Sequence, residues 1–365
     1  MTSGPVGEQA EAELIAAVDA AAGNLTLNRP RALNALNTFM RAQMAEAMKK
    51  WAADPEIYAV VLAASGGKAF CAGGDVRELL NWVRTDPAKA RQSVADEYRL
   101  VWQIDCFPKP IVALIDGLVM GSGAGISMFA THRVAGPNYA FAMPETALGF
   151  FPDVGATVFL GRLPGAVGTY LGLTGERIGR ADAFRLGIAS HCIDREHYPS
   201  IMKGLAAAEV VDPLLDGFHA DPGPGPLATR RDAIDRCFSA ADVPEILARL
   251  EAEKAEHRDW AQAALEKLRR ASPLSLAVAL RQLREGRALG LKAALEREHR
   301  MTVNHMASPD FAEGVRALLV DKDGAPRWRH AIDGVAQSEV EGIFAPLLDG
   351  ELALPARPQP PVFQE

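Results

Sequence analysis

Short apolar segments alternate with amphipathic ones through the N-terminal part of the chain. Residues 24–28 alternate apolar and polar side chains, as a half-buried strand does, and residues 59–64 and 111–115 are continuous apolar runs that predict buried strands. Residues 34–51 carry apolar side chains at helical spacing and stop before Asp54-Pro55, so they predict a helix. Strands and helices in this alternation predict an α/β domain.

The same alternation continues to about residue 193. A loop is expected over residues 65–75, and strands over residues 139–142 and 189–193. Helices are expected from about residue 76 and over residues 87–103, 125–130, 162–174 and 179–186.

Both ends of the chain differ from this central part. Residues 221–226 read DPGPGP, a strong linker signal, and the chain after them has helical periodicity over residues 244–270, 274–285, 291–306 and 309–319. The start of the chain is expected to lack order, and the acidic, alanine-rich segment to Ala22 to be helical. We therefore divide the chain into an extension (1–23), an α/β core (24–220), a linker (221–226), a helical region (227–350) and a tail (351–365).

Composition excludes several classes of protein. The 365 residues are 48% hydrophobic and 23% charged, which is ordinary for a soluble protein. The net charge of −7 gives no indication of a basic surface that would bind nucleic acid. The four cysteines are scattered, without a CxxC pair, and the histidines lack metal-ligand spacing, so neither disulfides nor a metal site is expected. No basic N-terminal segment and no apolar run of about 18 residues is present, which predicts a cytoplasmic protein that does not contact a membrane.

Two carboxylates stand in an otherwise apolar stretch, FAMPETALGFFPDVGATVFLGRL. Glu145 follows Pro144, and Asp153 follows Pro152. A buried acid needs a partner or a chemical role, and proline fixes the local backbone direction. The pair is consistent with proton transfer, although two structural carboxylates bonded to loop amides would have the same pattern.

Glycines cluster after two predicted strands. KAFCAGGDV contains Gly73 and Gly74, and the segment that follows residues 111–115 contains Gly117, Gly121, Gly123 and Gly125. Such turns let backbone N–H groups approach a ligand, and two converging N–H groups can stabilise an oxyanion. Close packing of helix and strand is the alternative explanation. The segment does not match the G-x-G-x-x-G fingerprint of dinucleotide-binding sites, because Ile126 replaces the third glycine. It does not match the G-x-S-x-G motif of a nucleophile elbow around Ser122 either, because Met120 stands where that motif has its first glycine.

With these motifs in this order, the sequence resembles the crotonase (enoyl-CoA hydratase/isomerase) superfamily. The residues that carry the resemblance are LNRPRALNAL (27–36), KAFCAGGDV (68–76), the glycine loop and the MPET box. Within the superfamily, FPDVG and the distal FAEGVRALLVDKD (311–323) are similar to the 3-hydroxyisobutyryl-CoA hydrolases. The resemblance implies a spiral of ββα units followed by a helical region, and hydrolysis of an acyl-CoA thioester in valine breakdown.

The resemblance also implies roles for individual residues. Backbone N–H groups of Gly74 and Ser122 would bind the thioester oxygen, and serine departs from the glycine usual at the second position. Glu145 would attack the thioester carbonyl or activate water, and Asp153 would handle protons and the substrate hydroxyl. The expected substrate-contacting residues are Gly73, Gly121 and Glu97, of which Glu97 could equally be a solvated helix residue.

Coenzyme A enters these expectations only as part of the substrate, without a separate cofactor. The resemblance points to the backbone of Arg31, Ala32, Leu33, Ala69, Ala72 and Gly73 around pantetheine and adenine, and to Lys68, Arg29 and Lys322 as candidate phosphate partners.

Two other functions are compatible with the same motifs. Hydration or isomerisation of an enoyl-CoA is the first, but Gly125 occupies the position of the second hydratase glutamate. The second is an acyl-CoA-binding protein without catalysis, since Ser122 breaks the glycine pattern. Many crotonases are trimers or pairs of trimers, so the resemblance points to a homo-oligomer, but the helical region after the linker could instead cover the surface that joins subunits.

Overall fold

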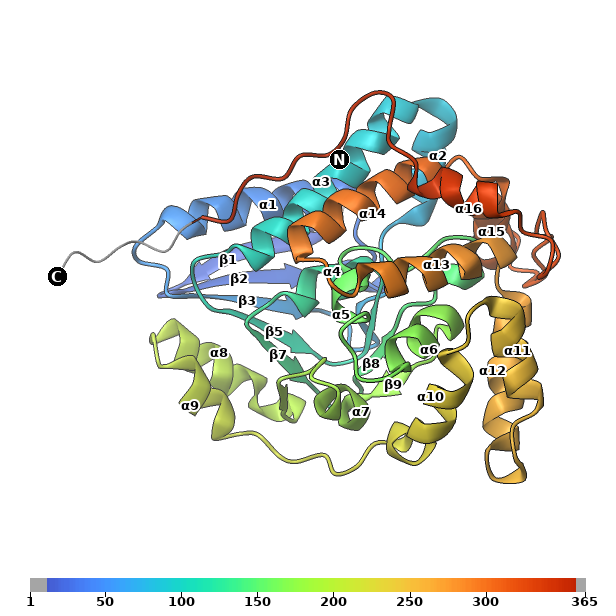
Figure 1. Ribbon diagram of the computed structural model, residues 1–365. Coiled ribbons are helices and arrows are strands. Elements are labelled where there is room, and N and C mark those ends of the chain that lie inside the picture. Colours follow the sequence, from blue (N-terminus) through green and yellow to red (C-terminus); the bar gives the residue numbers. More distant parts are fainter. Residues whose placement is uncertain (1–11, 359–365) are drawn as a thin grey trace, which may run out of the picture.

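Two sheets form the centre of the molecule (Figure 1). The computed structural model describes residues 12–358. The larger sheet has the order β1 (Leu14–Asp19), β2 (Ala22–Leu27), β3 (Ala59–Ala64), β5 (Ile111–Ile115), β7 (His132–Ala135) and β10 (His191–Cys192). The smaller sheet has the order β4 (Ala69–Cys71), β6 (Leu118–Met120), β8 (Ala140–Ala142) and β9 (Ile178–Gly179).

Successive strand pairs alternate between the two sheets. β3 and β4, then β5 and β6, then β7 and β8 each contribute one strand to the larger sheet and the next to the smaller one. Neighbours are parallel except at one edge of each sheet, where β1 pairs antiparallel with β2 and β9 with β8. This is a spiral of ββα units, so the α/β fold expected from the sequence is confirmed.

Helices follow the strand pairs and then form the C-terminal region. Those up to residue 216 are α1 (Thr38–Ala53), α2 (Val76–Thr85), α3 (Pro87–Asp105), α4 (Ser122–Met128), α5 (Ala156–Phe159), α6 (Val167–Thr174), α7 (Arg180–Arg185), α8 (Tyr198–Ala206) and α9 (Val211–Asp216). The C-terminal helices are α10 (Arg231–Phe238), α11 (Val243–Glu251), α12 (Arg258–Arg270), α13 (Pro273–Gly286), α14 (Leu291–His305), α15 (Pro309–Val315) and α16 (Gln337–Phe344). A π-helical turn, Arg316–Val320, follows α15.

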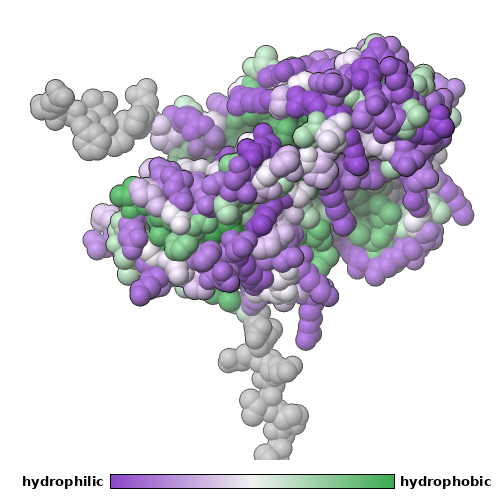
Figure 2. Space-filling model, turned by 90° about the horizontal axis from the view of Figure 1, so that it is seen from below, coloured by the Kyte–Doolittle hydropathy of each residue, from purple (hydrophilic) through white to green (hydrophobic). Residues whose placement is uncertain are grey.

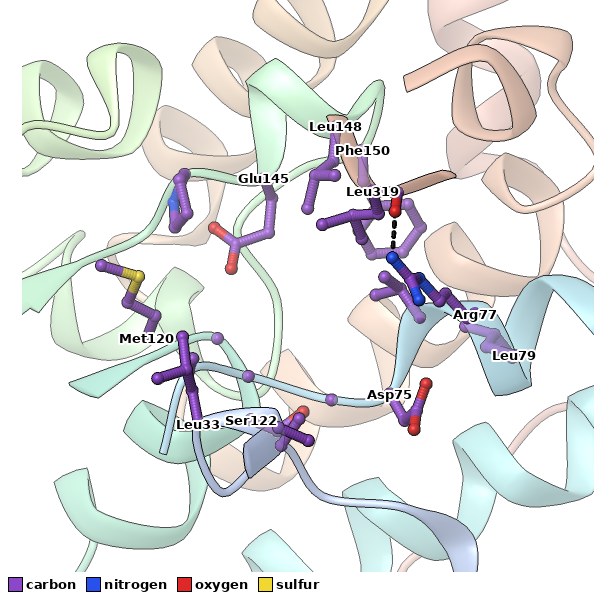
Figure 3. Close-up of a pocket in the computed structure, with 18 of the residues that line it drawn as sticks. Leu33, Asp75, Arg77, Leu79, Met120, Ser122, Glu145, Leu148, Phe150 and Leu319 are labelled. Carbon is purple, nitrogen blue, oxygen red and sulfur yellow. Dashed lines mark hydrogen bonds between the residues drawn. The ribbon is translucent and has the colours of Figure 1, made fainter. Parts of the chain in front are cut away.

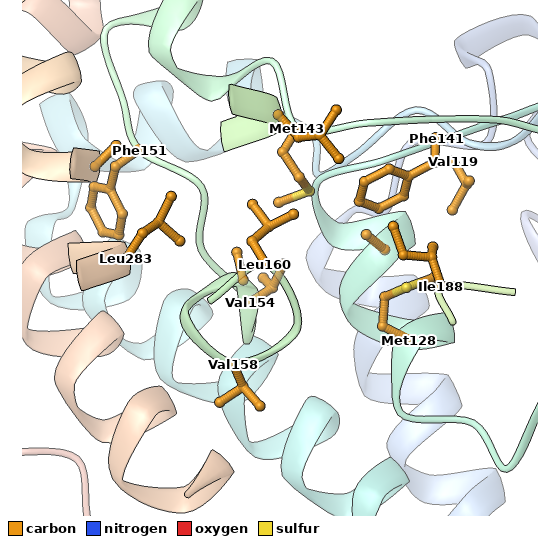
Figure 4. Close-up of a cluster of buried hydrophobic side chains, with 14 of the residues drawn as sticks. Val119, Met128, Phe141, Met143, Phe151, Val154, Val158, Leu160, Ile188 and Leu283 are labelled. Atoms are coloured by element: carbon orange, nitrogen blue, oxygen red, sulfur yellow. The ribbon is translucent and has the colours of Figure 1, made fainter. Parts of the chain in front are cut away.

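The C-terminal helices pack directly on the spiral. α13 contacts α5 and α6, and α14 contacts α3 and α5 (Figure 1). One large apolar core joins the two parts, and Figure 4 shows Leu283 of α13 beside Phe151, with Val154 and Leu160 nearby.

Hydrophilic residues cover most of the face shown in Figure 2, with hydrophobic residues in the recesses between them. Among residues 12–358, no helix combines the length and hydrophobicity that a membrane crossing requires.

Several local predictions were wrong. The alanine-rich segment before Ala22 forms strand β1 rather than a helix, and the predicted loop over residues 65–75 contains strand β4. The helix expected over residues 162–174 begins only at Val167, because Pro164 and Gly165, with φ of +61°, interrupt it. The expected helix over residues 244–270 is the packed pair α11 and α12. The predicted disorder of the first residues lies outside the described residues, and the division into domains stays a prediction.

Candidate active site

A cavity of about 730 Å³ lies where the ends of β4 and β6 meet the turn that carries the acids. This volume falls within the range usual for small-molecule sites. Figure 3 shows the Glu145 carboxylate facing the cavity, with Leu33 and Ser122 on the opposite wall and Met120 at the side. The predicted site residues that line it are Gly73, Gly74, Glu97, Gly121, Ser122, Glu145 and Asp153. The structure therefore brings together all the residues expected to act on the acyl group.

Two glycine turns form one wall of the cavity. Gly73, at the end of β4, has φ of +115°, and Gly121, at the end of β6, has φ of +47° and ψ of −122°. Only glycine adopts such angles readily. A Cβ added to Gly121 would lie 3.4 Å from Gly73 Cα and 3.0 Å from Glu145 Oε1, so the two turns and this carboxylate are in direct proximity.

The N–H groups of Gly74 and Ser122 are available to a ligand. Ser122 is the first residue of α4, where the helix provides no acceptor for the amide. Among residues 12–358, neither amide donates to a backbone carbonyl or to a side chain. A Cβ on Gly74 would lie 2.8 Å from Ser122 Oγ, which shows how close the two residues are. The pair has the composition of an oxyanion hole.

Glu145 is a buried acid that forms no ion pair with any residue in the described range 12–358. It begins the short 3-10 turn Glu145–Leu148 and is 7% exposed. Its Oε2 atom has no hydrogen-bond partner among the described residues, and burial raises the pKa of the carboxyl to about 8. With this pKa the carboxyl is mostly protonated at neutral pH, and once ionised it is a base or nucleophile.

Asp153 lies on a turn with unusual backbone angles. The next residue, Val154, has φ of +52°, which is rare for a β-branched residue, and Gly155 has φ of +95°. Tyr98 of α3 donates a hydrogen bond of 2.8 Å to Asp153 Oδ2, and the Tyr98 hydroxyl also lies 2.7 Å from Thr302 Oγ1 of α14. Burial first, and then the charges of Glu97, Glu145 and Glu298, raise the pKa of Asp153 well above its usual range.

Glu97 is neither solvated nor unpaired. Ser122 Oγ donates a hydrogen bond to its Oε1 atom, and Arg41 lies 3.3 Å from its Oε2 atom. Arg41 is itself buried and donates to Ser93. The serine at the second oxyanion position is therefore tied to α3 and α1 by a buried polar network.

Gly125, which the resemblance aligns with the second glutamate of the hydratases, is closely surrounded by side chains. A Cβ at this position would meet Val154 Cβ at 2.7 Å and Val101 Cγ2 at 3.3 Å. These distances leave no room for a longer side chain unless the Asp153 turn moves. The position is filled by the turn that carries Asp153.

Most of the predicted coenzyme A residues line the same cavity. Arg29, Arg31, Ala32, Leu33, Ala72 and Lys322 lie there, whereas Lys68 and Ala69 do not. The Ala69 carbonyl accepts a hydrogen bond of 2.9 Å from Asn34, and Arg29 is paired with Glu13 and Asp75. In the described part of the chain, Arg31 and Lys322 form no salt bridge, so their charges are available to an anionic ligand.

Sequence reasoning missed the polar residues that support the acids. Tyr98, Thr302, Glu298 and Arg41 are all buried beside or behind the cavity. Glu298 and Thr302 share a helix face with buried Leu291 and Leu295, so polar residues on an apolar stripe were the available signal. Among residues 12–358, no group of three His, Cys, Asp or Glu side chains could hold a metal ion.

A family model described as enoyl-CoA hydratase/isomerase matches residues 22–344. The chain belongs to the enoyl-CoA hydratase/isomerase family. Within this family it is 40% identical to the mitochondrial 3-hydroxyisobutyryl-CoA hydrolase of Xenopus tropicalis, over 91% of this chain and 89% of that one. It is also 40% identical to the human mitochondrial enzyme of that name, over 90% and 88% of the two chains. The cytoplasmic location expected from the sequence stays a prediction beside these mitochondrial relatives.

Solved structures of the family have the same fold. A Rhodobacter sphaeroides protein described as an enoyl-CoA hydratase is 41% identical, with a TM-score of 0.88, and the match covers 94% of this chain and 100% of that one. A carnitinyl-CoA dehydratase from Mycobacterium thermoresistibile is 36% identical, with a TM-score of 0.89, over 94% and 99% of the two chains. The names of the relatives and of the solved structures thus refer to different reactions. The geometry of the site must therefore decide which of these reactions fits this protein.

Proposed function

We propose that this protein hydrolyses an acyl-CoA thioester, with 3-hydroxyisobutyryl-CoA as substrate and 3-hydroxyisobutyrate and free CoA as products. The names of the relatives that are about 40% identical support this substrate. The same likeness supports a role in valine breakdown.

One observation carries the proposal: Glu145 and Asp153 share a cavity with two glycine turns, while Val154 fills the space beside Gly125. Alkene hydration in this family uses a second glutamate at the position of Gly125. Here the second acid comes from a different turn, and the space for the hydratase glutamate is occupied. This arrangement supports hydrolysis over hydration.

The reaction needs a stabilised oxyanion and a nucleophile. The thioester oxygen would accept hydrogen bonds from Gly74 N–H and Ser122 N–H, and each such donor typically contributes about 3 to 4 kcal/mol to transition-state stabilisation. Ionised Glu145 then either attacks the carbonyl carbon or removes a proton from the water that attacks it. Direct attack gives an anhydride that water hydrolyses in a second step. In both routes the carbon–sulfur bond breaks, its electron pair goes to sulfur, and the sulfur takes up a proton so that CoA leaves as a thiol.

Asp153 is suited to complete the proton transfers. Its carboxyl is held by Tyr98, and its raised pKa favours a protonated acid that can donate to the leaving sulfur or to the substrate hydroxyl. The CoA moiety would extend along Ala32, Leu33 and Ala72, with Arg31 and Lys322 near its phosphates. No cofactor beyond the CoA of the substrate enters this scheme.

The proposal is tested by separating CoA release from loss of a double bond. The purified protein is incubated with 3-hydroxyisobutyryl-CoA and, separately, with crotonyl-CoA, while a thiol reagent and the enoyl absorbance are followed. Thiol release from the first substrate, and its loss in Glu145→Gln, is the expected result. Loss of enoyl absorbance without thiol release would overturn the proposal in favour of hydration, and saturable binding without turnover would indicate a binding protein.

A further inference from the structure

Two fully buried polar side chains hold the Asp153 turn from behind. Gln282 of α13 and Glu298 of α14 are both 0% exposed, and neither lines the cavity. Both contact residues 152–157, the segment that contains Asp153 and the start of α5. A carboxylate buried away from the reacting centre needs a reason, because burial of charge is costly.

The contacts of these two side chains are with the backbone on either side of Asp153. Glu298 Oε2 accepts a hydrogen bond of 2.6 Å from Gly155 N–H, and Glu298 Oε1 accepts one of 2.9 Å from Thr157 N–H. Gln282 Nε2 donates bonds of 2.7 Å to the Pro152 carbonyl and 2.9 Å to Thr157 Oγ1. The backbone is thus fixed immediately before Asp153 and two residues after it.

The turn needs this support because its own conformation is unfavourable. Val154 has φ of +52°, which is strained for a β-branched residue, and such an angle persists only when the surroundings impose it. Gly155, with φ of +95°, adopts its angle without strain because it has no Cβ. The side-chain oxygen of Gln282 has no partner among the described residues, so the amide serves the turn through its NH₂ group. Burial raises the pKa of Glu298 to about 7 even though N–H groups of the turn donate to it, which underlines the cost of keeping this acid there.

We infer that Glu298, together with Gln282, is a positioning residue for Asp153: the C-terminal helices hold the turn in the one conformation that presents the aspartate to the substrate. The role in turnover rests on the proposed thioesterase function, whereas the support of the turn does not. The helical region is then part of the catalytic apparatus rather than only a cover for the spiral.

A double-mutant cycle tests the inference. Glu298→Gln is nearly isosteric but turns an NH₂ group toward one of the two amides. We expect it to lower kcat about tenfold or more while KM changes little, because a small displacement of a reacting group is costly. In the Asp153→Asn background the same substitution should change kcat less than about twofold, because the carboxylate that Glu298 positions is no longer there.

The matched control is Asp182→Asn. Asp182 is also a buried carboxylate that accepts a backbone N–H, from Leu227 at 3.0 Å, but it lies outside the cavity, so stability can fall while kcat is kept. If Glu298→Gln does not fold, Gln282→Met takes its place in the double-mutant cycle, because it removes the hydrogen bonds from Gln282 to Pro152 and Thr157. An unchanged kcat, or an equal loss in both backgrounds, would overturn the inference.

A second readout is independent of catalysis. Hydrogen exchange of the peptide that covers residues 150–160 should become faster in Glu298→Gln and stay unchanged in Asp182→Asn. If the unsubstituted protein releases no CoA, the proposed function fails, and the exchange measurement still decides the positioning role. Equal exchange in Glu298→Gln and the unsubstituted protein would exclude it.

Discussion

The two walls of the active site are built in opposite ways. The oxyanion wall consists of backbone turns at the ends of β4 and β6, where glycines with positive φ leave N–H groups free. The acid wall consists of side chains on turns 144–157, fixed by hydrogen bonds from α3, α13 and α14. The first wall depends on local conformation, and the second depends on residues that are 55 to 143 positions away in sequence. Each wall can therefore be broken separately.

The largest effect is expected at the acid wall itself. Glu145→Gln should fold normally but lose CoA release by about 10³-fold, because no base or nucleophile is left beside the thioester carbon. The measurement is thiol release under substrate saturation. Turnover within tenfold of the unsubstituted protein would exclude the role assigned to Glu145.

The oxyanion wall is broken by Gly74→Ala. The added methyl group would lie 2.8 Å from Ser122 Oγ, so either amide is displaced, and we expect a loss of about 10²-fold in kcat. The double variant Gly74→Ala/Ser122→Gly removes the clashing hydroxyl and should recover most of this loss. Without such recovery, the spacing of the two turns is not what limits the rate.

Gly125→Ala tests the contact between the two walls. Its methyl group would lie 2.7 Å from Val154 Cβ, and overpacking of this kind costs about 1–3 kcal/mol of stability. We expect a lower Tm and a several-fold lower kcat, since Val154 adjoins Asp153. Gly342→Ala on α16 is the control, because its methyl group meets no atom within 4 Å and a helical alanine should raise stability slightly.

A pH dependence of the acid wall is also expected in the unsubstituted protein. Glu145 acts as the ionised form, and its pKa of about 8 means that log kcat/KM should rise with pH and level off above about pH 8. Between pH 7 and pH 9 the rise should be about tenfold, since the ionised fraction increases by that factor. A profile that is flat between pH 6 and pH 9 would show that Glu145 is already ionised in the free enzyme.

The fold was predictable where the signal is local. The apolar runs over residues 59–64 and 111–115 coincide with β3 and β5, because a buried parallel strand is apolar on both faces. β1 was missed because only Leu14 of its six residues is buried, and the strand is specified by pairing with β2 rather than by its own pattern. The stretch over residues 244–270 was predicted as one helix because it contains good helix formers, whereas packing between α11 and α12 decides where it turns.

The sequence by itself determined the two glycine turns and the two acids. A glycine with positive φ, and an acidic residue directly after a proline in a turn, each depend on only a few adjacent residues. Only the tertiary structure decided what supports them: the hydroxyl of Tyr98 on Asp153, the carboxylate of Glu298 on the turn behind it, and Val154 in the space beside Gly125. Such contacts join distant segments, and no single stretch of sequence contains both partners. Buried polar groups must find partners wherever the fold brings them, and this requirement selects the final geometry of the site.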